Sequence, residues 1–417
     1  MSAPFEVLHD YARRVARERG LSNQPSEPKD WLTAREAAEL LGVRTETVYA
    51  YASRGLLATA RGPGKKALYP RAAVETLRTK AAARAGHTAV AAAALRWGEP
   101  VLDSAITQLT PRGPVYRGQR AIDLVETPYE QVAERLWKRR ADWDAIEPRV
   151  PVRSQRPSVP ALLEVVVGRA TALRDAPLVG PAEERSREAV GLLRRLATAA
   201  GPHEALAESQ LSIAARVGAS LAGASVPTRV QKLINACLVL LADHELNPST
   251  FAARVAASAR APWVDCLVSA LGAAAGVRHA SACDLAEDLW ERARLVDRSG
   301  MKAFVAAELA AGGLAGFDAG AYPRGDPRAK RLLQLVLPVM RSGDRARAVA
   351  LTDAVDDATG QLPAIDFALA LTTRHLHLPR GSATMLFVIG RVAGWLAHIE
   401  EQLASDDFIR PRARYAP

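Results

Sequence analysis

The sequence predicts a mainly helical protein with more than one domain, and three observations support this. Alanine is abundant throughout the 417 residues, and alanine is the strongest helix former. Aromatic residues make up only 5%, and runs of the β-branched and aromatic residues typical of strands are scarce. A chain of this length exceeds what one hydrophobic core usually organises, so two or three domains are expected.

Composition and cysteine usage indicate a cytoplasmic protein. Hydrophobic residues make up 49% and charged residues 24%, which is ordinary for a soluble globular chain. We find no apolar run as long as a membrane span, and the N-terminal segment MSAPFEVLHDYARRVARERG lacks a signal-peptide core. Cys237, Cys266 and Cys283 lie far apart without paired spacing. We therefore expect reduced thiols in a core, not a disulfide framework or a zinc site.

Positive charge is concentrated at the front of the chain. Residues 1–97 contain 16 Lys and Arg against 9 Asp and Glu, whereas the other 320 residues contain 39 against 36. A basic front end of this kind suits a module that contacts phosphates. A solvated arginine-rich surface produces the same bias, so charge alone leaves both interpretations open.

Two short helices and a wing are predicted between residues 30 and 85. Thr33 and Glu36 have the spacing of a capping box, and Gly42 ends the helix that they begin. A second helix follows with Val48 facing inward, and the two helices with their glycine turn make a helix-turn-helix. The segment ATARGPGKKALYP (58–70) then predicts two strands around a Gly-Pro-Gly turn, with a third helix from about Arg71.

This order of elements resembles the MerR-type winged helix-turn-helix. The resemblance implies that Arg44, Thr45, Thr47, Tyr49 and Arg54 face DNA, and that Arg61, Lys65 and Lys66 contact phosphates. Similar modules also dock proteins, and Tyr49 or Tyr51 packing in the small core is an equally open alternative. We expect a helical extension at 1–29, the winged domain at 30–85 and a connecting helix at 86–98.

Six collinear segments of the remaining chain carry a second resemblance. They are DSAITQLTPRGPVYRG (103–118), AIDLVETPYEQVAERLW (121–137), PTRVQKLINACLVLLADHELNPSTFAARVAASA (227–259), GFDAGAYPRGDPRAKRLL (316–333), IGRVAGWLAHIEEQ (389–402) and IRPRARY (409–415). Together with AIDF (364–367), they are similar to the citrate synthase family. The resemblance implies a helical large domain at 99–282 and 371–417 and a small domain at 283–370.

The resemblance also implies a reaction and a set of site residues. Condensing an acyl-CoA with oxaloacetate needs a base for the α-proton, donors for the enolate, and cations for a dicarboxylate. By resemblance, Asp366 is the base and His279 the enol stabiliser. The implied oxaloacetate-binding residues are His244, Arg328, Arg391 and Arg410. In the family the last arginine reaches in from the partner subunit, which implies a homodimer; acyl-CoA is a co-substrate, and no separate cofactor or metal is expected.

Several departures from the family pattern fall on the chemistry. Ala319 stands where the family has the histidine that activates the keto group, and neighbouring Asp318 would repel oxaloacetate. The loop around His279 loses two glycines and an asparagine, and Arg278 adds a cation expected to lower the pKa of that histidine or to bind an anion. His375 and His377 form an HxH pair, but nearby cysteine or carboxylate partners are lacking, so we expect no metal there.

Three functions remain compatible with these residues. The first, which we favour because the arginine set is retained, is an acyltransferase that condenses an acyl-CoA, acetyl-CoA foremost, with oxaloacetate or another 2-oxo acid at an impaired site. The second is a ligand-sensing DNA-binding regulator with a degenerate synthase body. The third is a non-catalytic partner subunit of a complete citrate synthase.

Overall fold

The computed structural model divides the chain into two units, Met1–Asp103 and Ser104–Pro417. It describes residues 31–53, 56–61, 67–71, 73, 74, 77, 102–143, 157–172, 182–203, 211–317, 321, 322 and 325–411. The predicted extension at 1–29, the connecting helix at 86–98 and the Gly-Pro-Gly turn of the wing lie outside these residues.

The first unit contains the predicted helix pair and a small antiparallel sheet. In α2, the side chain of Thr33 accepts the Glu36 N–H at 3.3 Å, and the Glu36 carboxylate accepts the Thr33 N–H at 2.8 Å, so the capping box forms. Gly42 ends α2 with a φ of 66°, a left-handed conformation that glycine adopts without strain. The elements are β1 (Trp31–Thr33), α2 (Ala34–Leu41), α3 (Thr45–Ser53), β2 (Ala60–Arg61) and β3 (Ala67–Pro70).

The sheet of the first unit has one strand more than the sequence predicts. Its order is β1-β3-β2, because Trp31–Thr33 pairs with β3 alongside the two strands of the wing. The strand is only three residues long, and its pairing with residues 68–70 is a long-range contact that local sequence does not reveal. A compact core closes the unit, made of Leu32, Ala37, Ala38, Val48, Leu57, Tyr69 and Val74.

The second unit is mainly helical, as predicted, and its described residues form one small antiparallel sheet of order β4-β5-β6. Its elements are β4 (Thr107–Thr110), β5 (Gly113–Tyr116), β6 (Gln119–Arg120), the 3-10 helix η2 (Ala121–Asp123), α6 (Tyr129–Trp137), α7 (Val159–Ala172), α8 (Ala182–Thr198), α9 (Ile213–Ala222), α10 (Thr228–Leu241), α11 (Pro248–Ser258), α12 (Trp263–Ala274), α13 (Ala282–Ala293), α14 (Met301–Ala310), α15 (Pro327–Val336), the 3-10 helix η3 (Leu337–Val339), α16 (Ser342–Thr359), α17 (Ile365–His375) and α18 (Ser382–Leu403).

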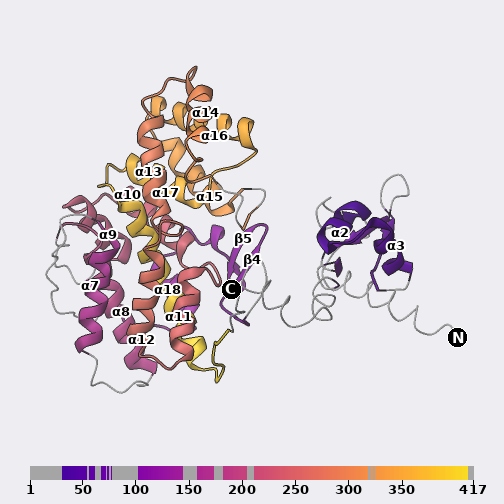
Figure 1. Ribbon diagram of the computed structural model, residues 1–417. Helices are drawn as coiled ribbons and strands as arrows, with labels where there is room; N and C mark the ends of the chain where they lie inside the picture. Colours follow the sequence, from indigo (N-terminus) through magenta and orange to yellow (C-terminus); the bar gives the residue numbers. More distant parts are fainter. Residues whose placement is uncertain are drawn as a thin grey trace, which may run out of the picture. The chain divides into compact units, whose positions relative to one another are not determined.

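Helix α18 runs through the middle of the second unit, with α10, α11 and α12 packed around it (Figure 1). Its 22 residues are long and apolar enough to cross a membrane, contrary to the expectation that no segment is. The whole of its apolar window is buried inside the protein. A helix that is apolar on all sides is expected in the core of a large protein, so packing alone accounts for this composition.

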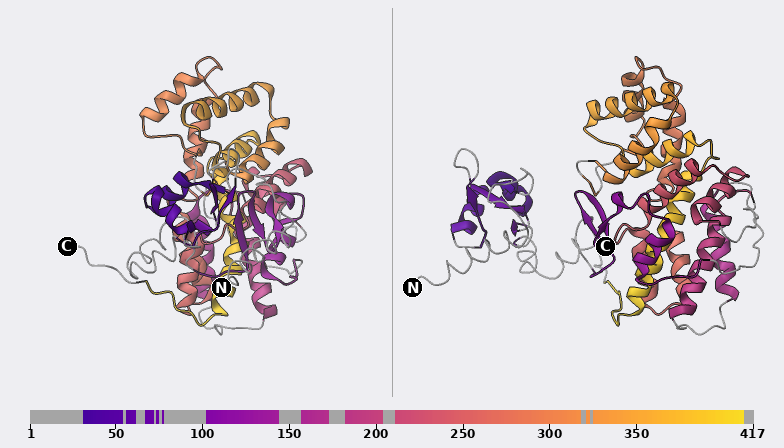
Figure 2. Two further views of the ribbon diagram at one scale, coloured as in Figure 1. Left: turned by 90° about the vertical axis from the view of Figure 1, so that its right-hand side faces the viewer. Right: turned by 180° about the vertical axis from the view of Figure 1, so that it is seen from behind.

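Two hydrophobic cores form within the second unit. The larger one surrounds α18, and the smaller one draws its buried residues from positions 289 to 371, including Trp290, Phe317 and Leu351. Helices α14 and α16 pack together at the end away from α7, α8 and α12 (Figures 1 and 2). The division into a large domain and a small domain at 283–370 stays a prediction, which the separate second core supports.

Candidate functional site

His244 lies in the loop between α10 and α11 and is held by a tyrosine. Its Nε2 atom is 2.9 Å from the hydroxyl of Tyr322, and the two rings meet edge to face. Burial, with the neighbouring Arg328 cation, holds the pKa of His244 well below its usual value. The imidazole is therefore neutral at physiological pH, and it can donate or accept one hydrogen bond.

His279 lies in the turn between α12 and α13, where a serine holds its ring. Ser249 Oγ is 2.7 Å from His279 Nε2 and 2.6 Å from the side-chain oxygen of Asn247, and it accepts the Trp395 indole N–H at 3.1 Å. Asn247 caps α11, followed by proline at its first position, a sequence typical of a helix start. The cap therefore places Ser249 against the histidine and leaves Nδ1 for another partner.

The pKa of His279 is lowered to about 4. Burial is the main cause, and the charge of Arg391 adds to it. The direction agrees with the expectation from sequence, but the expected cause was wrong. Arg278 precedes His279 in the chain yet is exposed, whereas Arg391 comes from the distant helix α18 and is buried.

Arg391 is a buried cation without hydrogen bonds on two of its nitrogens. Only 1% of this residue is exposed, and Nε and Nη1 have no partner among the residues that the structure describes. Its guanidinium carbon lies 5.2 Å from the centre of the Phe387 ring, and burial lowers the pKa of Arg391 to about 10. Leaving such donors unpaired in a protein interior is costly, so the arrangement fits an anion that supplies the missing acceptors.

Arg328, in contrast, is already paired within its own chain. Asp326 caps α15, because its side chain accepts a hydrogen bond from the Arg328 backbone N–H at 2.9 Å. Its two carboxylate oxygens also accept hydrogen bonds from Nε and Nη2 of Arg328, at 3.0 and 2.7 Å. The guanidinium also lies over the Tyr322 ring, 5.7 Å from its centre. These two hydrogen bonds fix the orientation of the guanidinium. Its other terminal nitrogen, Nη1, takes no part in them.

Asp366 lies in the first turn of α17, partly exposed. The thiol of Cys283 donates to its Oδ1 at 3.2 Å. Burial raises the pKa of Asp366, although the Cys283 hydrogen bond and the Arg328 charge oppose this rise. A carboxylate with a raised pKa is a stronger base than an ordinary aspartate.

Five of the six predicted catalytic and substrate-binding residues thus form one site. The charges of Arg328 and Arg391 act on His244, Arg391 acts on His279, and Arg328 acts on Asp366. These side chains come from the α10–α11 loop, from the turn between α12 and α13, and from α15, α17 and α18. The arrangement combines cations for an anionic ligand, neutral imidazoles and a base.

Arg410 is the exception, because it is exposed and lies on the segment that follows α18. That segment is held to its own chain by Arg260, which donates to the Ser405 carbonyl at 2.9 Å, and by the Ile409 N–H, which donates to Ser258 Oγ at 3.2 Å. Among the described residues, Arg410 has no hydrogen bond or ion pair with the other five.

Asp318 and Ala319 lie outside the described residues, so the expected impairment of the site stays a prediction. Sequence reasoning did not assign roles to Tyr322, Ser249 or Cys283. The only signals were the Asn-Pro-Ser and Asp-Pro-Arg cap sequences and the position of Cys283 just after the His279 turn. None of these shows which distant side chain will be the partner.

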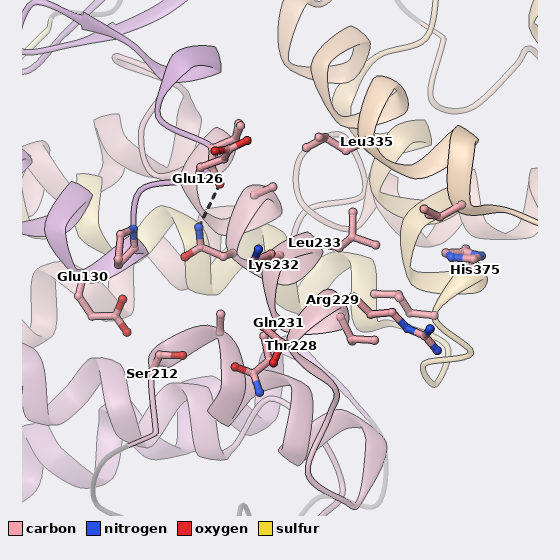
Figure 3. Close-up of a pocket in the computed structure, with 18 of the residues that line it drawn as sticks. Glu126, Glu130, Ser212, Thr228, Arg229, Gln231, Lys232, Leu233, Leu335 and His375 are labelled. Carbon is pink, nitrogen blue, oxygen red and sulfur yellow. Dashed lines mark hydrogen bonds between the residues drawn. The ribbon is translucent and has the colours of Figure 1, made fainter.

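A separate cavity of about 1060 Å³ lies at the other end of α10. Figure 3 shows His375 and Arg229 at one end of it, Lys232 between, and Glu130 and Ser212 at the other end. None of the predicted catalytic or substrate-binding residues lines this cavity. The α10 residues that line it belong to the first part of the helix, from Thr228 to Ala236, whereas His244 follows the end of the helix at Leu241.

In the first unit, the predicted DNA-facing residues are only partly described. Arg44 is exposed and Tyr49 is 53% exposed, whereas Thr45 and Thr47 are half-buried. Of the two tyrosines considered from sequence, Tyr51 packs against the core of this unit and Tyr49 does not. The remaining predicted contacts fall on side chains outside the described part: Arg54, Arg61, Lys65 and Lys66.

The two neutral histidines should make the fold sensitive to acid. An unfolded chain protonates a histidine near pH 6.5, but folded His279 resists protonation down to about pH 4. Between these values the unfolded chain binds more protons, so stability falls as the pH falls. The loss from His279 is on the order of 2–3 kcal/mol, after allowing for solvent at the partly exposed ring, and His244 acts in the same direction.

Urea unfolding from pH 7 to pH 4 checks this expectation. His279→Gln should flatten the dependence on pH. His377→Asn, at an exposed residue with a φ of 55° that asparagine tolerates, should leave the dependence as in the wild type. Equal slopes for the wild type and His279→Gln would show that this histidine is not held neutral by the fold.

A helical unit that gathers two buried arginines, two neutral histidines and a basic carboxyl defines a site for acid–base chemistry on an anion. Residues 94–412 match the family model described as citrate synthase, C-terminal domain. The chain belongs to the citrate synthase family. Residues 31–81 match a helix-turn-helix domain, which agrees with the elements of the first unit.

Relatives and solved structures agree with this assignment. The chain is 35% identical over 192 residues to "Citrate synthase" of Synechocystis sp., covering 44% of this chain and 48% of that protein. It is 30% identical over 250 residues to "2-methylcitrate synthase 2" of Corynebacterium glutamicum, covering 59% and 63%. The matches therefore span about half to two-thirds of these relatives. A citrate synthase from Thermoplasma acidophilum, solved with carboxymethyl coenzyme A and oxaloacetate, shares the fold with a TM-score of 0.66 at 20% identity, over 77% of this chain and 95% of that one.

Proposed function

We propose that the second unit condenses an acyl-CoA, acetyl-CoA foremost, with oxaloacetate or a related 2-oxo acid. The observation that carries this proposal is Arg391, a buried guanidinium with two unpaired nitrogens among the described residues, whose charge acts on His244 and His279. A dicarboxylate supplies the missing acceptors, since Nε and Nη1 donate from different edges of the guanidinium and the two carboxylates offer oxygens to both. Arg328 and His244 lie close enough to share this ligand.

The remaining residues account for the carbon chemistry. Asp366 takes a proton from the α-carbon of the thioester, and the enolate carbon attacks the keto carbon of the 2-oxo acid to form the new bond. His279 is neutral, and Ser249 holds its Nε2. When the Ser249 hydroxyl turns from Asn247 Oδ1 to donate to Nε2, the ring proton is on Nδ1 and is available to stabilise the enolate oxygen. The keto oxygen takes up one proton and becomes a hydroxyl, and one water then hydrolyses the thioester, which leaves a carboxylate and releases CoA as the thiol.

Ala319, which stands where the family has a histidine, predicts a slow enzyme. A methyl group cannot donate to the keto oxygen, and loss of one such donor typically lowers the rate by about 10²–10³-fold. We therefore expect measurable but weak turnover. This impairment rests on the family resemblance of the segment GFDAGAY.

Release of the CoA thiol tests the proposal. The full chain is mixed with acetyl-CoA or propionyl-CoA, with and without oxaloacetate, and the thiol is detected with a disulfide reagent. The proposal predicts release that depends on both substrates. No release above the rate without protein, with any acyl-CoA offered, would rule out the enzyme.

We further propose that the protein is a homodimer in which Arg410 of each copy reaches the substrate site of the other. Within its own chain this arginine is exposed and apart from the site, yet the segment before it is firmly held by α11 and the turn after it. A fixed segment that ends in an exposed cation suits a role in a second copy. Light scattering on the purified protein should give twice the mass of 44.6 kDa; a stable monomer would exclude the exchange.

A second candidate function is regulation of DNA binding by the ligand of this site. The helix-turn-helix match, the exposed Arg44 just before α3 and the exposed Tyr49 within α3 favour it. Binding through phosphates weakens as salt rises. A gel shift with genomic fragments, with and without oxaloacetate, should show a salt-sensitive complex that Tyr49→Ala weakens; no complex at low salt would exclude this function.

A further inference from the structure

The first turns of two helices meet at Asp366. Cys283 is the second residue of α13, Asp366 is the second residue of α17, and these helices pack along each other. The thiol is fully buried, and its sulfur lies 3.2 Å from Asp366 Oδ1. Among the described residues, Cys283 is the only side chain that hydrogen-bonds this carboxyl.

The thiol is a donor throughout the physiological pH range. Burial, followed by the charge of Asp366, raises the pKa of Cys283 well above its usual value. The S–H group therefore stays protonated and bonds one carboxylate oxygen. The other oxygen, Oδ2, has no hydrogen-bond partner among the described side chains, so it is free to take a proton.

This contact differs from the surroundings of the other two cysteines. Cys237 and Cys266 are also buried, but the bond of Cys266 is to a backbone carbonyl, that of Ala261 at 3.6 Å. A buried cysteine usually acts as a small apolar side chain. Only Cys283 faces the carboxyl that the proposed reaction needs as its base.

We infer that Cys283 is a positioning residue for the base: it fixes the rotation of the Asp366 carboxyl, presents Oδ2 to the substrate and tempers its basicity. This inference rests on the proposed condensation. Loss of the S–H bond would free the carboxyl to rotate and remove the larger of the two named effects that oppose burial, the other being the Arg328 charge, so the base would be misplaced and protonated at higher pH.

The dependence of the rate on pH distinguishes positioning from packing. Cys283→Ala should lower kcat several-fold near pH 7 and move the acid limb of kcat/KM to higher pH, with KM for oxaloacetate unchanged. Cys283→Ser keeps a donor of similar size and should restore the position of the acid limb. Cys266→Ala is the matched control and should leave the profile as in the wild type. A lower kcat with the same acid limb for Cys283→Ala would reduce the cysteine to a packing role.

A double-mutant cycle tests the contact without the reaction. Urea midpoints are measured for the wild type, Cys283→Ala, Asp366→Ala and the double variant. The two single shifts should fail to add, because each variant removes the same bond. Additive shifts would overturn the contact. If the shifts are coupled but no CoA is released by the wild type, the proposed condensation fails, and the positioning role fails with it, while the bond itself stands.

Discussion

Asp366→Asn should lower the rate of oxaloacetate-dependent CoA release by about 10²–10⁴-fold, the usual contribution of a general base. Asparagine keeps the size of the side chain and can still meet the Cys283 thiol, but its amide cannot accept the α-proton. Burial raises the pKa of Asp366, which makes it a better base than its surface counterparts. The oxaloacetate contacts of Arg391 stay intact, so KM for oxaloacetate should change little.

The matched control is Asp353→Asn on α16, an exposed aspartate of the same unit. It should keep the wild-type rate within a factor of two, as expected for surface substitutions. Initial rates at saturating substrate check both variants. Wild-type turnover by Asp366→Asn would assign the proton transfer to another group.

Gly394→Ala should have the largest effect on stability. An added Cβ would lie 2.3 Å from Asp243 Oδ1 and 2.5 Å from the Ala242 carbonyl oxygen, at the point where α18 crosses the end of α10. Neither backbone can move away without breaking the Gly394 N–H bond to Ala242 at 2.9 Å. Overpacking of this kind typically costs about 1–3 kcal/mol, and it would also shift the loop that carries His244.

Gly272→Ala in α12 is the matched control, because a Cβ there meets nothing within 4 Å. Alanine should stabilise this helix by about 0.5–1 kcal/mol. Thermal unfolding of both variants gives the comparison. Similar melting temperatures for the two alanine variants would contradict the close packing of α18 against α10.

The fold class and most of the site were predictable from sequence because they depend on local patterns and on collinear segments. Alanine content predicts helices, and the Thr33 and Glu36 spacing predicts the capping box that forms. The segments that resemble citrate synthase place five residues which the structure brings together. The family and the helix-turn-helix domain are confirmed by the matches.

The rest of the site depends on which distant side chains meet. Arg391, 112 positions after His279 in the chain, lowers the pKa of that histidine, whereas the adjacent Arg278 does not contribute. The pairing of Cys283 with Asp366, and of Ser249 with His279, likewise joins residues on different elements of the fold. Spacing along the chain carries no information about such partners until the helices are packed.

The central claim is that Arg391 is the buried cation of a dicarboxylate site, and calorimetric titration with oxaloacetate tests it most directly. Arg391→Met removes the charge and keeps an apolar side chain of moderate length, while Arg112→Met removes an exposed arginine of the same unit. Because two charge-assisted hydrogen bonds are lost, Arg391→Met should weaken binding by at least about 10²-fold, with Arg112→Met unchanged. Equal affinity for oxaloacetate in the wild type and Arg391→Met would contradict the claim.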